Sequence, residues 1–223
     1  MDRLPPQPKA STLGINIQVR VRVTELLDAY DDEGRHLGAL PRKVVHTDGY
    51  WHHVFHCLVV AERVDRMVGI LQKRSTCKST FPGLFDLTAT GHLAAGESPI
   101  DGRRELVEEV GFDVGAERLV PLVEWTLVDV SGDSEGHNRE IIHAFAVRDD
   151  RPLAAYAPYQ PEVSEVVEID LIDLLAVVTD GSSSEPLVAE ARGLDSAHRV
   201  TVNDVIPDID GYFAVVIEAA MNL

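Results

Sequence analysis

GHLAAGESPIDGRRELVEEVGF, residues 91–112, is the most informative stretch of this chain. Three of its glutamates, Glu105, Glu108 and Glu109, lie three and four residues apart and would share one face of a helix. Carboxylates at this spacing repel one another. A hard divalent cation such as Mg²⁺ or Mn²⁺ removes the repulsion, since it takes oxygen ligands and leaves positions for water and substrate phosphates. The stretch therefore predicts a metal platform for phosphate chemistry.

Both ends of this helix carry residues with known capping preferences. Ser98 suits the N-cap, Pro99 the first helical position and Asp101 the acid of a capping box. Gly111 suits the left-handed residue that ends a helix. The alternative interpretation is a solvated acidic helix in which Arg104 pairs with neighbouring glutamates. The glycine-rich lead-in and the capped start favour the metal platform.

The same residues resemble the Nudix box, whose pattern is G-x5-E-x7-R-E-U-x-E-E-x-G-U with U an apolar residue. The matching positions are Gly91, Glu97, Arg104, Glu105, Leu106, Glu108, Glu109, Gly111 and Phe112. One feature departs from the pattern, because only the six residues 98–103 separate Glu97 from Arg104, where the family has seven. The departure concerns how Glu97 and the Gly91 carbonyl are placed relative to a metal. It leaves open a second reading, a non-catalytic Nudix-like sensor of a nucleotide or sugar phosphate.

The resemblance extends over residues 25–220. The segment LQKRSTCKSTFPGLFDLTATGHLAAGES, residues 71–98, is similar to the Nudix subgroup related to isopentenyl-diphosphate isomerase. Residues 25–40 resemble the opening hairpin of that subgroup, and residues 162–175 its last strand and following helix. The isomerase requires a reactive cysteine just after the FPG segment, where this chain has Leu87–Thr90. Hydrolysis is therefore favoured, and a prenyl-diphosphate isomerase is the third alternative.

The resemblance implies a metal-dependent hydrolase in which water attacks a diphosphate linkage. The substrate would be a small molecule, a nucleoside diphosphate linked to a further group or a related diphosphate. The Mg²⁺ or Mn²⁺ ligands it implies are three carboxylates and one carbonyl, those of Glu105, Glu109, Glu108 and Gly91. Arg104 would orient a glutamate through a charge-assisted hydrogen bond, and Glu97 would hold that arginine.

Several cations lie close to the box in sequence and could hold substrate phosphates: Lys73, Arg74, Lys78, Arg103 and Arg104. We single out Lys73 and Arg74 as substrate-binding candidates; the alternative for both is a solvated strand end and loop. His92 follows the box glycine and is a third candidate, against a turn residue satisfied by the backbone. The general base outside the box stays open among four acids, Glu135, Glu140, Glu162 and Glu165.

Length, composition and charge fit one compact cytoplasmic enzyme. The chain has 223 residues, of which 45% are apolar and 26% charged, ordinary values for a globular protein. Two cysteines give no disulfide framework, which favours a reducing cytoplasm. We expect no membrane span, because no apolar run reaches about eighteen residues. The net charge of −17 argues against binding to a nucleic-acid duplex.

The apolar pattern and the resemblance together predict an α/β (α+β) fold, a Nudix-type α/β/α sandwich with a mixed sheet. Strands are expected at residues 15–23, 53–60, 67–73, 85–90, 119–130, 141–147 and 166–170, a hairpin at 25–40, and helices at 171–178 and 212–221. We expect residues 1–13 to be disordered and residues 14–223 to form a single Nudix domain with an added N-terminal strand and a C-terminal helix. The added strand leaves a homodimer open.

Overall fold

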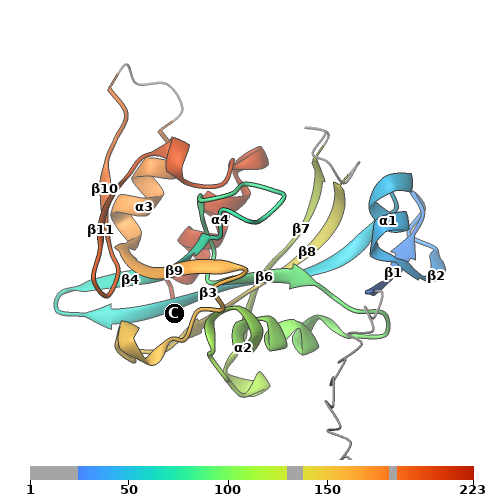
Figure 1. Cartoon of the computed structure of the whole chain (residues 1–223), viewed down its shortest axis with the longest axis horizontal. Coiled ribbons are helices and arrows are strands. Elements are labelled where there is room, and N and C mark those ends of the chain that lie inside the picture. Colours follow the sequence, from blue (N-terminus) through green and yellow to red (C-terminus); the bar gives the residue numbers. More distant parts are fainter. Residues whose placement is uncertain (1–24, 130–137, 181–184) are drawn as a thin grey trace, which may run out of the picture.

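A computed structural model describes residues 25–129, 138–180 and 185–223 of the chain. Within these residues nine strands form one mixed sheet, with helices on both of its faces (Figure 1). The order along the sheet is β11-β10-β9-β4-β3-β8-β7, with β5 beside β4 and β6 beside β3. Strands β3 and β8 run parallel, and the other described pairs are antiparallel.

The strands of this sheet are β3 (His52–Arg63), β4 (Arg66–Arg74), β5 (Phe85–Asp86), β6 (Ala89–His92), β7 (Val120–Asp129), β8 (Asn138–Arg148), β9 (Val163–Asp170), β10 (Ala189–Arg192) and β11 (Ala197–Val200). A separate hairpin is formed by β1 (Leu26–Tyr30) and β2 (His36–Pro41). The α-helices are α1 (Arg42–Asp48), α2 (Arg104–Val110), α3 (Leu171–Val178) and α4 (Tyr212–Ala220). The short 3-10 segment η1 (Pro99–Arg103) leads directly into α2.

Alternation along β3 explains why both faces of the sheet are covered. Leu58 and Val60 pack in the core that includes α3 and α4, whereas Cys57 and Val59 pack in the core that includes α2. All four side chains are fully buried. The predicted α/β/α sandwich around a mixed sheet is thus confirmed. Cys57 is the buried core thiol that its apolar surroundings indicate, and burial raises its pKa.

The box helix begins with a 3-10 turn instead of an α-helical one. Ser98 and Asp101 form the expected capping box, with the backbone N–H of Ser98 donating to the Asp101 carboxylate at 2.9 Å. A 3-10 helix takes about 3.0 residues per turn, against about 3.6 in an α-helix. η1 spans five of the six residues of the shortened spacer, so this part of the box uses fewer residues per turn than an α-helix would.

Glycine permits this tight turn to lie directly against the sheet. Gly102 is buried, and a Cβ atom built on it would lie 2.4 Å from Cβ of Phe55 and 2.8 Å from Cδ2 of Leu93. No side chain fits in that space. At the other end of the box, Gly111 has a φ of 67° and ends α2 in the left-handed conformation that the sequence predicts.

Most of the expected elements are present, with three differences. The expected strand at residues 85–90 is broken into β5 and β6, while α1 and the β10–β11 hairpin were not predicted. The expected strand at residues 15–23, like the expected disorder at 1–13, lies outside the described residues. None of the helices in the described part of the chain is both long and apolar enough to cross a membrane.

Candidate active site

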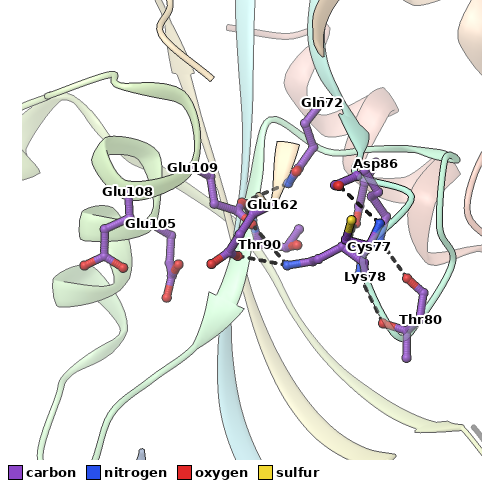
Figure 2. Close-up of polar contacts among 12 residues, drawn as sticks. Gln72, Cys77, Lys78, Thr80, Asp86, Thr90, Glu105, Glu108, Glu109 and Glu162 are labelled. Carbon is purple, nitrogen blue, oxygen red and sulfur yellow. Dashed lines mark hydrogen bonds and ion pairs between the residues drawn. The ribbon is translucent and has the colours of Figure 1, made fainter. Parts of the chain in front are cut away.

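Two glutamates of α2 turn toward the sheet, and a third turns away from it. The exposed fraction is 2% for the Glu109 side chain and 12% for Glu105, against 59% for Glu108. Glu105 and Glu109 are one helical turn apart, so their carboxylates lie on the same side of α2. Figure 2 shows the acids of this helix beside the polar residues of the neighbouring strands and loop. The three acids therefore divide into an inner pair, Glu105 and Glu109, and one outer acid, Glu108.

Gly91 brings the backbone of β6 against the inner pair. A Cβ atom at Gly91 would lie 2.2 Å from Cδ of Glu105 and 2.3 Å from its Oε1. The carboxylate thus occupies the space that any larger residue would fill, which explains why a glycine stands at this position. The shortened spacer has not separated the box glycine from the helix.

Arg104 connects the loop, the strand and the helix of the box. Its Nε and Nη2 donate to the two carboxylate oxygens of Glu97, at 2.8 and 3.0 Å. Nη2 also donates to the His92 carbonyl at 2.8 Å, and Nη1 donates to Glu105. Burial alone would raise the pKa of Glu97, but the hydrogen bonds from Arg104 and from the Ala94 backbone hold it below its usual range. Arg104 and Glu97 therefore have the positioning contacts that the resemblance implies for them.

Burial makes the inner pair difficult to ionise. It raises the pKa of Glu109 to about 8 and that of Glu105 to about 7. Gln72 Nε2 and the backbone N–H of Thr90 both donate to Oε2 of Glu109, at 2.8 and 2.9 Å. These donors favour the ionised form of Glu109 without outweighing its desolvation. A bound Mg²⁺ or Mn²⁺, whose preferred ligands are oxygens, would favour the ionised form of both carboxylates.

Lys78 and Glu162 bring two further charges to the inner pair (Figure 2). Lys78 Nζ lies 2.9 Å from Oε2 of Glu162 and 3.9 Å from Oε1 of Glu109. Lys78 comes from the loop between β4 and β5, and Glu162 directly precedes β9. Parts of the chain that are distant in sequence thus supply a cation and an acid to one place.

Two of the other acids considered as general base have partners away from the inner pair. Glu165 pairs with His198, Nε2 to Oε2 at 2.8 Å, and also accepts from Ser196. Glu140 accepts from Asn138 Nδ2 at 2.7 Å. Glu135 lies outside the described residues. Glu162 is therefore the one member of the four that the described structure brings to the inner pair.

Arg74 and Lys73, the two predicted substrate-binding cations, have other partners. The guanidinium of Arg74 donates to Asp86 at 2.9 Å and to Oγ1 of Thr80 at 3.1 Å. It thereby fixes the loop that carries Lys78. Lys73 Nζ lies 5.3 Å from the centroid of the Phe85 ring. Phe85 belongs to the core on the α3 and α4 side. Lys78, which sequence alone did not single out from its neighbours, reaches the inner pair instead.

Three histidines from different segments meet beside the box. They are His46 of α1, His52 of β3 and His92 of β6, and their ligating atoms lie within 4.8 Å of one another. His52 Nδ1 lies 3.2 Å from the Tyr50 carbonyl, which can only accept, so Nδ1 carries the proton and Nε2 a lone pair. That buried Nε2 has no hydrogen-bond partner among the described residues.

The environment of this histidine cluster keeps two of its rings, those of His52 and His92, neutral. Burial lowers the pKa of His52 to about 4 and that of His92 well below its usual value, with Arg42 contributing to both. Glu25 Oε1 lies 3.9 Å from Nδ1 of His92. Neutral imidazole is the form that ligates metals. His92, predicted to touch substrate, thus belongs to a second group of residues that could hold a cation.

The arrangement of box glycine, arginine and buried acids agrees with comparisons to known proteins. The NUDIX domain family pattern matches residues 40–190, more than half of the chain. This chain belongs to the Nudix family. A protein of Clostridium acetobutylicum named as an uncharacterized Nudix hydrolase is 32% identical to it over 203 residues, 89% of this chain and 98% of that protein. The chain is accordingly a Nudix hydrolase, and its family suggests pyrophosphohydrolase activity.

More distant Nudix relatives agree with this assignment. A solved structure of a Deinococcus radiodurans protein aligns with a TM-score of 0.54 at 19% identity, over 72% of this chain and 93% of that one, which shows the fold alone. An isopentenyl-diphosphate Δ-isomerase of Corynebacterium glutamicum is 31% identical over 114 residues, 48% of this chain and 59% of that protein. The similarity to isomerases thus covers about half of this Nudix protein.

Proposed function

We propose that this Nudix protein is a metal-dependent hydrolase that cleaves a diphosphate linkage in a nucleoside diphosphate-type or related substrate. The observation that carries the proposal is the inner pair, Glu105 and Glu109. Their burial opposes the ionised form of both acids, and a divalent cation would relieve that opposition. Glu105, Glu109 and the Gly91 carbonyl would hold Mg²⁺ or Mn²⁺, with the exposed Glu108 as an outer ligand. When bound, such an ion stabilises charge on the phosphates and lowers the pKa of a bound water.

The residues around the inner pair have distinct tasks in this proposal. Arg104 keeps Glu105 in place and is itself held by Glu97. Lys78 stands 3.9 Å from Glu109 and would contact a substrate phosphate. Glu162 would accept the proton of the attacking water as its oxygen bonds to phosphorus and the bridging P–O bond breaks. The bridging oxygen leaves with the departing phosphate group.

The test is release of phosphate products from a panel of nucleoside diphosphates, dinucleotides, nucleotide sugars and prenyl diphosphates. Each substrate is offered with Mg²⁺, Mn²⁺ or EDTA, to the natural chain and to Glu109→Gln. Metal-dependent release from one class, lost in the variant, supports the hydrolase and names its substrate. Absence of any turnover, with a nucleotide or sugar phosphate still raising Tm, favours the sensor instead. Isomerisation of a prenyl diphosphate without hydrolysis would favour the third alternative.

We also propose that the histidine cluster holds a second cation that prefers nitrogen ligands, such as Zn²⁺. Its support is the unpartnered lone pair of the buried His52 Nε2, which lies beside ring nitrogens of His46 and His92. Metal analysis after dialysis against Zn²⁺ should show one ion lost in His52→Ala and kept in Glu109→Gln. Equal zinc content in the natural chain and His52→Ala would contradict it. The homodimer and the cytoplasmic location remain predictions.

A further inference from the structure

We propose that Gln72 is a positioning residue that fixes the carboxylate of Glu109 for metal binding, an inference that rests on the proposed function. Gln72 lies on β4, in the interior of the sheet, and its side chain is fully buried. Its Nε2 lies 2.8 Å from Oε2 of Glu109 (Figure 2). In the ionised form that would bind a metal, the Glu109 carboxylate can only accept, so the NH₂ end of the amide must face it.

The other end of the same amide shows that this contact is not there for packing. Oε1 of Gln72 is buried and has no hydrogen-bond partner among the described residues. A buried amide oxygen without a partner destabilises a fold, and an apolar side chain of similar shape would avoid that cost. Stability alone therefore does not favour glutamine at this position. A hydrogen-bond donor aimed at Glu109 does.

The strand that carries Gln72 is paired on both of its sides at this residue. Gln72 of β4 lies opposite Asp86 of β5 on one side and opposite Val166 of β9 on the other. Its donor and the Thr90 backbone N–H both bind Oε2 of Glu109. The second oxygen, Oε1, faces Lys78 at 3.9 Å. The two donors thus fix one oxygen and leave the other for a cation, so Gln72 acts on the metal through Glu109.

Mn²⁺ binding, followed by electron paramagnetic resonance without substrate, tests this role. Gln72→Met keeps the size of the side chain and removes the donor. The matched control is Thr88→Val, which removes a fully buried hydroxyl that bonds to the backbone at Val59 and Ile70. Glu109→Gln reports on the site itself. Thermal unfolding of each protein without metal shows that it is folded at the assay temperature.

We expect the Kd for Mn²⁺ to rise about ten-fold or more in Gln72→Met and to stay within about two-fold in Thr88→Val. A Kd within about two-fold of the natural chain in Gln72→Met would overturn the inference. If Gln72→Met does not fold, Gln72→Asn replaces it, because the shorter amide of asparagine cannot reach Glu109. The same changes in the Kd for Mn²⁺ then support or overturn the inference. If Gln72→Met and Glu109→Gln both bind Mn²⁺ like the natural chain, the proposed function is contradicted together with the role of Gln72. If Glu109→Gln loses Mn²⁺ binding and Gln72→Met keeps it, only the role of Gln72 is contradicted.

Discussion

Replacing Glu109 by glutamine should stabilise the metal-free protein, and the gain should depend on pH. Glu109 is 2% exposed, and burial raises its pKa from the ordinary 4.5 to about 8. Between these two pH values the unfolded chain has released the proton while the folded chain still binds it. The folded state therefore loses stability as pH rises through this window, and nothing is lost below it. Glutamine has the same shape and no proton to release.

The magnitude follows from the two pKa values. A pKa difference of one corresponds to about 1.4 kcal/mol. At pH 7 a buried acid with a pKa of about 8 in place of 4.5 destabilises the fold by about 3 kcal/mol. For a chain of this size, that gain in Glu109→Gln corresponds to a Tm higher by about 6–12 °C. Glu105 titrates in the same window, so the pair shares the dependence.

Thermal unfolding in EDTA at pH 4.5 and pH 7 measures this difference. Glu108→Gln is the matched control, because the Glu108 side chain is 59% exposed and its replacement should change stability by less than about 0.5 kcal/mol. A gain in Glu109→Gln of the same size at both pH values, or no gain at pH 7, would refute the burial argument. Saturating Mg²⁺ should reverse the order, because only the natural chain keeps both ligands.

Three further substitutions follow from the contacts of the box. Gly91→Ala places a Cβ 2.2 Å from Glu105 Cδ, so we expect Mn²⁺ affinity to fall about ten-fold or more in a titration while the protein stays folded. Gly102→Ala places a Cβ 2.4 Å from Phe55 Cβ and should lower the free energy of unfolding in urea by about 1–3 kcal/mol; an unchanged midpoint would contradict the close approach. Arg104→Lys cannot form the two-pronged contact with Glu97, and kcat should fall about 10–100-fold with a folded protein; unchanged kcat would remove Arg104 from the mechanism.

The box helix shows what sequence could predict and what it could not. Its cap at Ser98 and Asp101 and its end at Gly111 depend on local backbone geometry, and the structure has all three as predicted. The spacing of Glu105, Glu108 and Glu109 predicts one face, but burial divides them into an inner pair and an outer acid. The exposed fraction depends on how α2 packs against β6 and β9. The sequence shows that the spacer between Glu97 and Arg104 is one residue shorter than the family pattern. It does not indicate that this spacer forms a 3-10 turn.

The residues that surround the inner pair come from other strands and could not be read from local patterns. Gln72 and Lys78 reach Glu109, and Glu162 reaches Lys78, because β4 lies beside β9 in the sheet. From the sequence we chose Lys73 and Arg74 and not Lys78, although no local pattern distinguishes these three neighbouring cations. The period of the strand could have separated Lys73, because it places Gln72 and Lys73 on opposite faces, and Lys73 lies over Phe85 on the α3 and α4 side. The same period places Arg74 on the face of Gln72, so it does not separate Arg74 from Lys78.

The measurement that tests the central claim most directly is product release from the responsive diphosphate, with added Mg²⁺ or EDTA, in the natural chain, Glu105→Gln and Glu109→Gln. The inner pair predicts release that needs the metal and falls by about 100-fold or more in either variant. Release that persists in EDTA, or that is unchanged in both folded variants, would contradict the claim that Glu105 and Glu109 hold the catalytic cation.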